Sequence, residues 1–94
     1  MDILEIANVL DEVVKNECVV IVRLRNKSGE HLDVSFSTRI TQANVSKDNI
    51  TIYTQNKDDL ISFNYEYIDR TDGKGYSKIN FNTNAICLTV NIKY

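Results

Sequence analysis

The hydrophobic period of this chain changes at Cys18, and that change limits the fold more than any other feature of the sequence. Before it, apolar residues recur at the i, i+3, i+4, i+7 spacing of one helix face. These residues are Ile3, Ile6, Ala7, Leu10, Val13 and Val14. After it, apolar and polar residues alternate, as they do in β-strands. No second helical pattern follows, so βαβ architecture is excluded and an α+β fold with an antiparallel sheet is predicted.

The first segment predicts an amphipathic helix over residues 3–16. Asp2 and Glu5 have the spacing of a capping box, which satisfies free backbone N–H groups at a helix start. Leu4 and Val9 widen the apolar stripe beyond one face. The wide stripe indicates a helix laid deep in the sheet; the alternative is a spare edge that awaits a partner.

The remaining segments predict a five- to six-stranded sheet. The expected strands are 18–26, 30–37, 49–55, 60–68, 76–81 and 85–93. The polar segment 38–48 is predicted to be a surface loop. All other connections are short, so the simplest topology is an antiparallel meander with the helix packed on one face. A strongly curled sheet could instead form a small barrel, similar in architecture to SH3-like and Sm-like barrels but without a matching motif.

The alternation of the first two strands predicts their register. Leu24 is expected opposite Leu32 and Val22 opposite Val34, which leaves 27–29 as a three-residue loop. Gly29 then falls where such a loop requires a positive φ.

The same register places charged residues on the other face of this hairpin. It sets Arg23 opposite Asp33 and Arg25 opposite His31. This group, together with Arg39 and Tyr53, is the candidate interaction surface of the chain.

Length and composition predict a single domain, residues 1–94, with one core. The first residues are acidic where a signal peptide would be basic, and no apolar run could span a membrane, so a cytoplasmic location is expected. Cys18 and Cys87 are then expected to be reduced, small, buried or half-buried strand residues, with cross-strand pairing as the alternative.

The formal net charge of −2 argues against a strong nucleic-acid binder and against an acidic nucleic-acid mimic. The charges are unevenly distributed, however. Residues 1–17 carry five acids and one lysine, whereas residues 18–57 carry six cations and three acids. The expected molecule therefore has an acidic helix and a mildly basic first half of the sheet.

No residue pattern predicts catalysis, a metal site or a cofactor. His31 is the only histidine, which is too few for a metal site, and nothing places it beside a cysteine nucleophile. Residues 69–73 lack the alternating oxygen ligands and terminal glutamate of a calcium loop. The segment 73–75 is too short for a phosphate-binding loop. We therefore expect that the protein is not an enzyme.

Four of the tyrosines lie in the middle strands: Tyr53, Tyr65, Tyr67 and Tyr76. Tyr65 and Tyr67 share the parity of Phe63, which predicts core packing with a solvated hydroxyl. Tyr53 has the opposite parity from Ile50 and Ile52, so it is the tyrosine expected to be exposed. Tyrosine is common at protein interfaces and at base-stacking surfaces.

These expectations favour a small non-enzymatic protein-binding module, a regulator or inhibitor of a partner protein whose identity the sequence does not reveal. The codon-biased composition, rich in Asn, Ile and Lys, fits a phage or plasmid gene of a low-GC bacterium. An anti-CRISPR or immunity protein is the specific version of this hypothesis. Homo-oligomerisation is also expected, because the helix stripe and the strand edges need cover.

The alternative function is a small β-barrel that binds single-stranded nucleic acid or RNA. Its phosphate contacts would come from the basic first half of the sheet, and Tyr53 would stack on a base. The cations concerned are Arg23, Arg25, Lys27, Arg39 and Lys47.

Overall fold

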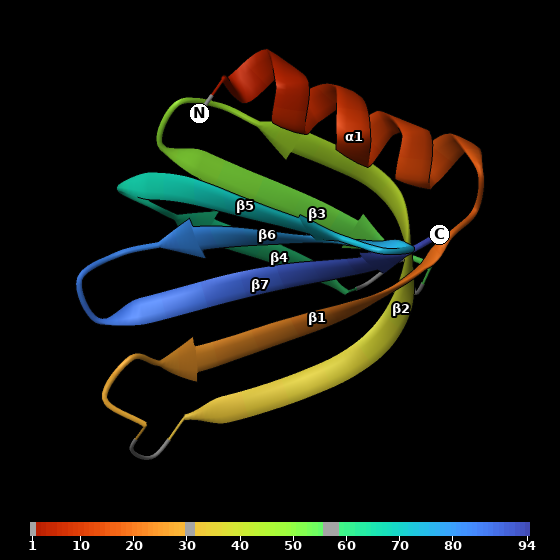
Figure 1. Ribbon diagram of the computed structural model, residues 1–94. Coiled ribbons are helices and arrows are strands. Elements are labelled where there is room, and N and C mark those ends of the chain that lie inside the picture. Colours follow the sequence, from red (N-terminus) through yellow and green to blue (C-terminus); the bar gives the residue numbers. More distant parts are fainter. Residues whose placement is uncertain (1, 30–31, 56–58) are drawn as a thin grey trace.

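The computed structural model describes residues 2–29, 32–55 and 59–94. In this part of the chain, one helix packs on a seven-stranded antiparallel sheet (Figure 1). The elements are α1 (Ile3–Lys15), β1 (Val19–Asn26), β2 (Asp33–Val45), β3 (Asn49–Thr54), β4 (Leu60–Asn64), β5 (Tyr67–Gly73), β6 (Tyr76–Asn82) and β7 (Ile86–Lys93). The predicted α+β class and helix are confirmed, whereas the predicted number of strands is wrong.

The strand order is β4-β3-β2-β1-β7-β6-β5, so the sheet is not the simple meander that was predicted. Two meanders, β1 to β4 and β5 to β7, are joined where β1 pairs with β7. The two outer strands, β4 and β5, follow one another along the chain and are separated only by Tyr65 and Glu66. The sheet therefore curls until its edges meet at that corner, but it does not close into a barrel.

The predicted loop at 38–48 is wrong, because residues 33–45 form the longest strand, β2. The first part of β2 pairs with β1 and the second part pairs with β3. The register shifts between Ile40 and Gln42, as at a β-bulge, which bends the strand. The bulge also shifts the alternation of inward and outward residues by one position. Before it, the even-numbered Ile40 is buried; after it, the odd-numbered Ala43 and Val45 are half-buried. That break in period explains why the segment resembles a loop.

The predicted strand 60–68 is in fact two strands, β4 and β5, separated by the Tyr65–Glu66 corner. Tyr65 is buried, as its parity predicts. After the corner, however, Ile68 packs against the core and Tyr67 is 48% exposed, so the expectation of a core position for Tyr67 is wrong. In the sequence, apolar and polar residues continue to alternate through the corner, so the sequence gives no signal that the strand ends there.

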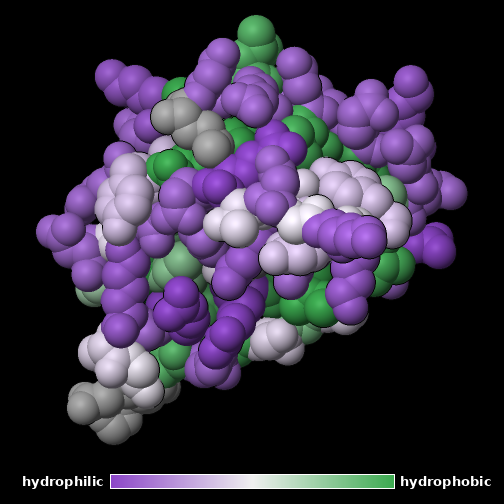
Figure 2. All heavy atoms as spheres, in the orientation of Figure 1, coloured by the Kyte–Doolittle hydropathy of each residue, from purple (hydrophilic) through white to green (hydrophobic). Residues whose placement is uncertain are grey.

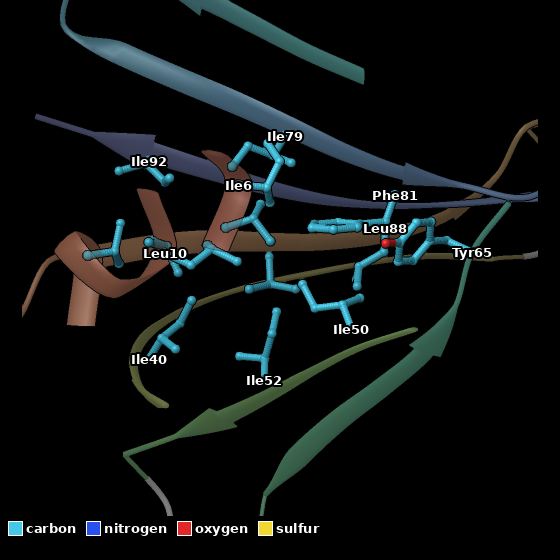
Figure 3. Packing of buried hydrophobic residues seen from close by; sticks show 14 residues of the cluster. Ile6, Leu10, Ile40, Ile50, Ile52, Tyr65, Ile79, Phe81, Leu88 and Ile92 are labelled. Carbon is cyan, nitrogen blue, oxygen red and sulfur yellow. The ribbon is translucent and has the colours of Figure 1, made fainter. Parts of the chain in front are cut away.

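The core lies between the two halves of the bent sheet and beneath the helix (Figure 3). α1 contributes Ile6, Leu10 and Val13, which are all fully or almost fully buried. Leu4 stays 66% exposed and Val9 is half-buried, so the helix is seated deeply along one face only. The strand residues of the core are Val20, Val22, Ile40, Ile50, Ile52, Tyr65, Ile79, Phe81, Leu88, Val90 and Ile92.

The start of α1 is fixed by its cap and by one ion pair. The Asp2 side chain accepts a hydrogen bond from the Leu4 N–H at 2.9 Å, which confirms the predicted N-cap. Glu5 instead faces Arg70 on β5, with 3.2 Å between Oε1 and Nη1. The helix is thereby tied to the far edge of the sheet.

The predicted register of the first hairpin is wrong by two residues. Leu24 pairs with Val34, and Arg25 pairs with Asp33 rather than with His31, which lies outside the described residues. Asn26 N–H donates to the Leu32 carbonyl at 3.0 Å, so the loop is longer than three residues. A two-residue shift preserves the faces, so the assignment of inner and outer side chains holds. Gly29 has the predicted positive φ, +79°.

The two thiols are free, so the alternative of a disulfide is wrong. Cys87 is buried and pairs in register with Arg25, near the end of β1, whereas Cys18 precedes the start of β1. The two cysteines thus lie at opposite ends of the β1–β7 pair. Among the described residues, no helix is long and apolar enough to cross a membrane.

Candidate functional site

The first part of β2 has a free side. Residues 33–39 pair with β1 on one side, and no strand in the described part of the chain pairs with the other side of residues 33–38. The Leu32 carbonyl accepts from Asn26 of β1, whereas the Arg39 carbonyl accepts from Gln55 N–H at 3.0 Å on the opposite side. Because antiparallel hydrogen bonding alternates along a strand, Asp33, Ser35 and Ser37 direct their N–H and C=O groups to the free side.

Beside this edge is a hollow of about 480 Å³. Phe36, Ser37 and Thr38 form one wall. The opposite wall comes from the end of β3 and the start of β4: Thr54, Gln55, Asp59, Leu60 and Ile61. The hollow lies where β2 bends away and the two halves of the sheet separate.

Two exposed apolar side chains line this hollow, Phe36 at 40% and Leu60 at 54% exposure. Val34, two residues before Phe36 on β2, is 51% exposed. Val34 and Phe36 have the inward parity, and Val22, the partner of Phe36, is buried. The inner face of the sheet is therefore left uncovered by other core residues at Val34 and Phe36. We call the backbone of residues 33–38, the side chains of Val34 and Phe36, and the adjoining hollow the β2 edge site.

The two outer strands of the sheet are less suited to receive another strand. β5 carries Asp69, Arg70 and Asp72, and charged residues protect an edge against pairing. β4 has only five residues. The free stretch of β2 has charges only at its ends, Asp33 and Arg39. It is therefore the edge with the least protection against an added strand.

The structure brings together only part of the predicted interaction surface. Arg23, Arg25 and Asp33 lie on the outer face of the β1–β2 hairpin. Arg39 is on the same face but at the bend, near the other end of β1. Tyr53 lies on β3, beyond the bend, and is half-buried rather than exposed as expected. His31 is not among the described residues.

Arg23 and Asp33 form a bidentate ion pair across the hairpin. Arg23 Nε and Nη2 donate to the two Asp33 carboxylate oxygens at 2.8 and 2.7 Å. The hydrogen bonds from Arg23 lower the pKa of Asp33, and those to Asp33 raise the pKa of Arg23. The predicted contact between these residues exists although they are not directly opposed.

The described residues contain no arrangement for catalysis that we recognise. Cys87 Sγ is near Thr89 Oγ1 at 3.5 Å and Asn80 Oδ1 at 3.7 Å, and neither partner is a base strong enough to activate a thiol. No group of three His, Cys, Asp or Glu side chains in the described ranges could hold a metal ion.

Sequence reasoning missed Val34, Phe36 and Leu60 as surface residues. Their alternation correctly places Val34 and Phe36 on the inner face. Whether an inner position is covered depends on where β3 leaves β2, which is set by the bulge near Ile40. No signal in the local sequence marks that point.

Comparison of the chain with protein-family models finds no match, and comparisons with curated proteins and with solved structures find none either.

Proposed function

We propose that the protein is a non-enzymatic protein-binding module that takes an extended segment of a partner protein along the β2 edge site. The carrying observation is the coincidence of a free strand edge with exposed apolar side chains. Such addition of a strand to a sheet edge is a common mode of peptide recognition. The protein would then act as a regulator or inhibitor by covering its partner's segment.

We infer the character of the partner segment from the geometry of the β2 edge site. Its backbone would pair with the outward N–H and C=O groups of Asp33, Ser35 and Ser37. Every second side chain of the segment would point to the inner face, where Val34, Phe36 and the hollow lie. We therefore expect a partner segment with apolar residues at alternate positions.

The backbone part of the proposal can be tested with a proline at the edge. Ser37→Pro removes an N–H that points to the free side, so pairing with β1 should survive while an added strand loses a hydrogen bond. Peptides selected from a random ten-residue library on the wild-type protein should bind Ser37→Pro at least about tenfold more weakly. The affinities would be measured by fluorescence anisotropy.

Ser62→Pro on β4 is the matched control. The Tyr65 N–H donates to Asp48 and the Thr54 N–H to Asp59, so Ser62, on the intervening parity, directs its N–H away from β3. This variant should bind the selected peptides like the wild type. Equal losses in both variants, or none in Ser37→Pro, would overturn the β2 edge site. If the wild type forms a dimer and Ser37→Pro does not, the edge would be assigned to a second copy of the chain instead.

The side-chain part of the proposal has its own matched pair. Phe36→Ala removes an apolar side chain beside the hollow and should weaken peptide binding by about 1–2 kcal/mol, as expected for an interface anchor. Val19→Ala removes a comparably exposed side chain, 52% accessible, from the outer face of β1 and should change affinity little. A loss confined to Val19→Ala would contradict the assignment.

A further inference from the structure

The outer face of the five-stranded part of the sheet concentrates the positive charge of the molecule. This face consists of the outward positions of β5, β6, β7, β1 and the first part of β2. It carries five cations, Arg23, Arg25, Arg39, Lys78 and Lys93, against two acids, Asp33 and Asp69. A chain with a net charge of −2 thus presents one face with an excess of positive charge.

The two acids on this face are already engaged within the protein. Asp33 pairs with Arg23 at 2.7 Å. Asp69 accepts hydrogen bonds from Asn80 Nδ2 at 2.6 Å and from Asn82 Nδ2 at 3.0 Å. Among the described residues, Arg25, Arg39, Lys78 and Lys93 take part in no ion pair. Their charges remain available to an anionic ligand.

One end of the face contains a hollow of about 370 Å³. It is lined by Lys74, Gly75, Tyr76, Asn91, Lys93 and Tyr94. Tyr76 and Tyr94 are 39% and 72% exposed. Asn91 Oδ1 is a buried acceptor without a hydrogen-bond partner in the protein. The Tyr94 hydroxyl donates to Ser77 on the inner face at 3.0 Å, so Tyr76 is the aromatic ring that this hollow offers on the outer face. Two amines, this ring and an unused acceptor match a phosphate, a stacked base and the amino group of that base.

The other end of the face carries a second exposed tyrosine. Tyr67 is 48% exposed, and Lys27 holds its hydroxyl at 2.6 Å with Nζ 4.7 Å from the ring centroid. Residues 87–93 of β7 connect the two ends, a span of about 20 Å at the rise of a strand. Lys78, Arg23 and Arg25 lie between them. Figure 2 shows that the face of the molecule bearing β1, β7 and β6 is mainly hydrophilic.

We propose that this outer face binds single-stranded nucleic acid, with one base in the hollow at Tyr76 and another on Tyr67. The cations between them neutralise the intervening phosphates. Single strands are favoured because stacking on tyrosine requires unpaired bases. The site differs from the alternative drawn from the sequence, since Tyr53 is on another part of the sheet and Lys78 and Lys93 join the cations. It is also independent of the β2 edge site, whose apolar side chains lie on the inner face.

The experiment measures anisotropy of fluorescent twelve-nucleotide DNA and RNA single strands of mixed sequence at low salt, with a duplex as competitor. The wild type should bind the single strands, and the duplex should compete poorly for it. The slope of the logarithm of the binding constant against the logarithm of the salt concentration should be near −3, as expected for about four neutralised phosphates. Arg25→Glu and Lys93→Glu should each weaken binding at least about tenfold. Lys15→Glu on α1 is the matched control and should stay within about twofold.

The aromatic part of the site is tested separately. Tyr76→Ala should weaken binding about tenfold, whereas Tyr76→Phe keeps the ring and the affinity. Each variant must show the wild-type unfolding transition. Absence of wild-type binding at low salt, an equal loss in Lys15→Glu, or equal affinity for duplex would each overturn the proposal. These results would leave the peptide experiments on the β2 edge site unaffected.

Discussion

Tyr65 is the side chain that holds the corner between the two outer strands. Its ring lies edge-on against Phe81 (Figure 3), with 5.4 Å between centroids. Its hydroxyl donates to the Ser46 carbonyl. Its backbone N–H donates to the Asp48 carbonyl at 3.0 Å. One residue therefore joins the turn after β2 to the core beneath β6.

Removing the Tyr65 hydroxyl should destabilise the protein measurably. Tyr65→Phe leaves the ring in place but deprives the Ser46 carbonyl of its donor, so the free energy of unfolding should fall by about 1 kcal/mol. Tyr67→Phe, whose hydroxyl is on the surface, is the control and should change stability less. Urea unfolding of both variants measures the difference, and equal effects would contradict the role of Tyr65.

Stability should also depend on Tyr65 at alkaline pH. Burial, and secondarily the charge of Asp48, raise the pKa of Tyr65 above its ordinary value. The folded state therefore favours the neutral phenol. Its contribution is complete below the unfolded pKa of about 10 and is lost as pH rises through the folded pKa. The loss of unfolding free energy above about pH 10 should be smaller in Tyr65→Phe than in the wild type; equal losses would contradict this.

At the scale of the element, α1 is attached through a single buried stripe. Leu10→Ala should lower the free energy of unfolding by about 2–5 kcal/mol, because the residue is completely buried. Leu4→Ala, at a 66% exposed position of the same helix, should lower it by well under 1 kcal/mol. Thermal and urea unfolding of the two variants give the comparison. Similar values would mean that the helix is seated differently.

The helix and most strands follow from local patterns, and these were predictable. The bounds of α1 and the Asp2 cap depend on residues within a few positions of one another. The length of β2 and the break at Tyr65 were not predictable, because the bulge near Ile40 hides one strand and continuous alternation hides the corner. The register of the first hairpin failed for a related reason: a shift of two residues preserves every face, so hydrophobicity alone does not distinguish the two pairings.

At the scale of the whole molecule, both proposed sites arise from contacts between distant segments. The pairing of β1 with β7 creates the wide outer face on which cations from separate parts of the sequence meet. The bend of β2 leaves the inner face uncovered at one end. Neither consequence is visible in a net charge or in a run of residues, which is why the predicted surface contained Arg23, Arg25 and Asp33 but missed Phe36 and Lys93.

The central claim, that β2 offers a free strand edge, can be tested on the isolated protein by amide hydrogen exchange. The N–H groups of Val34 and Phe36 point to β1 and should exchange slowly, whereas those of Ser35 and Ser37 point to the free side and should exchange at least about tenfold faster. This alternation, resolved by NMR for each residue, is the predicted result. Equal protection of all four groups would contradict the account, because the edge would already be covered.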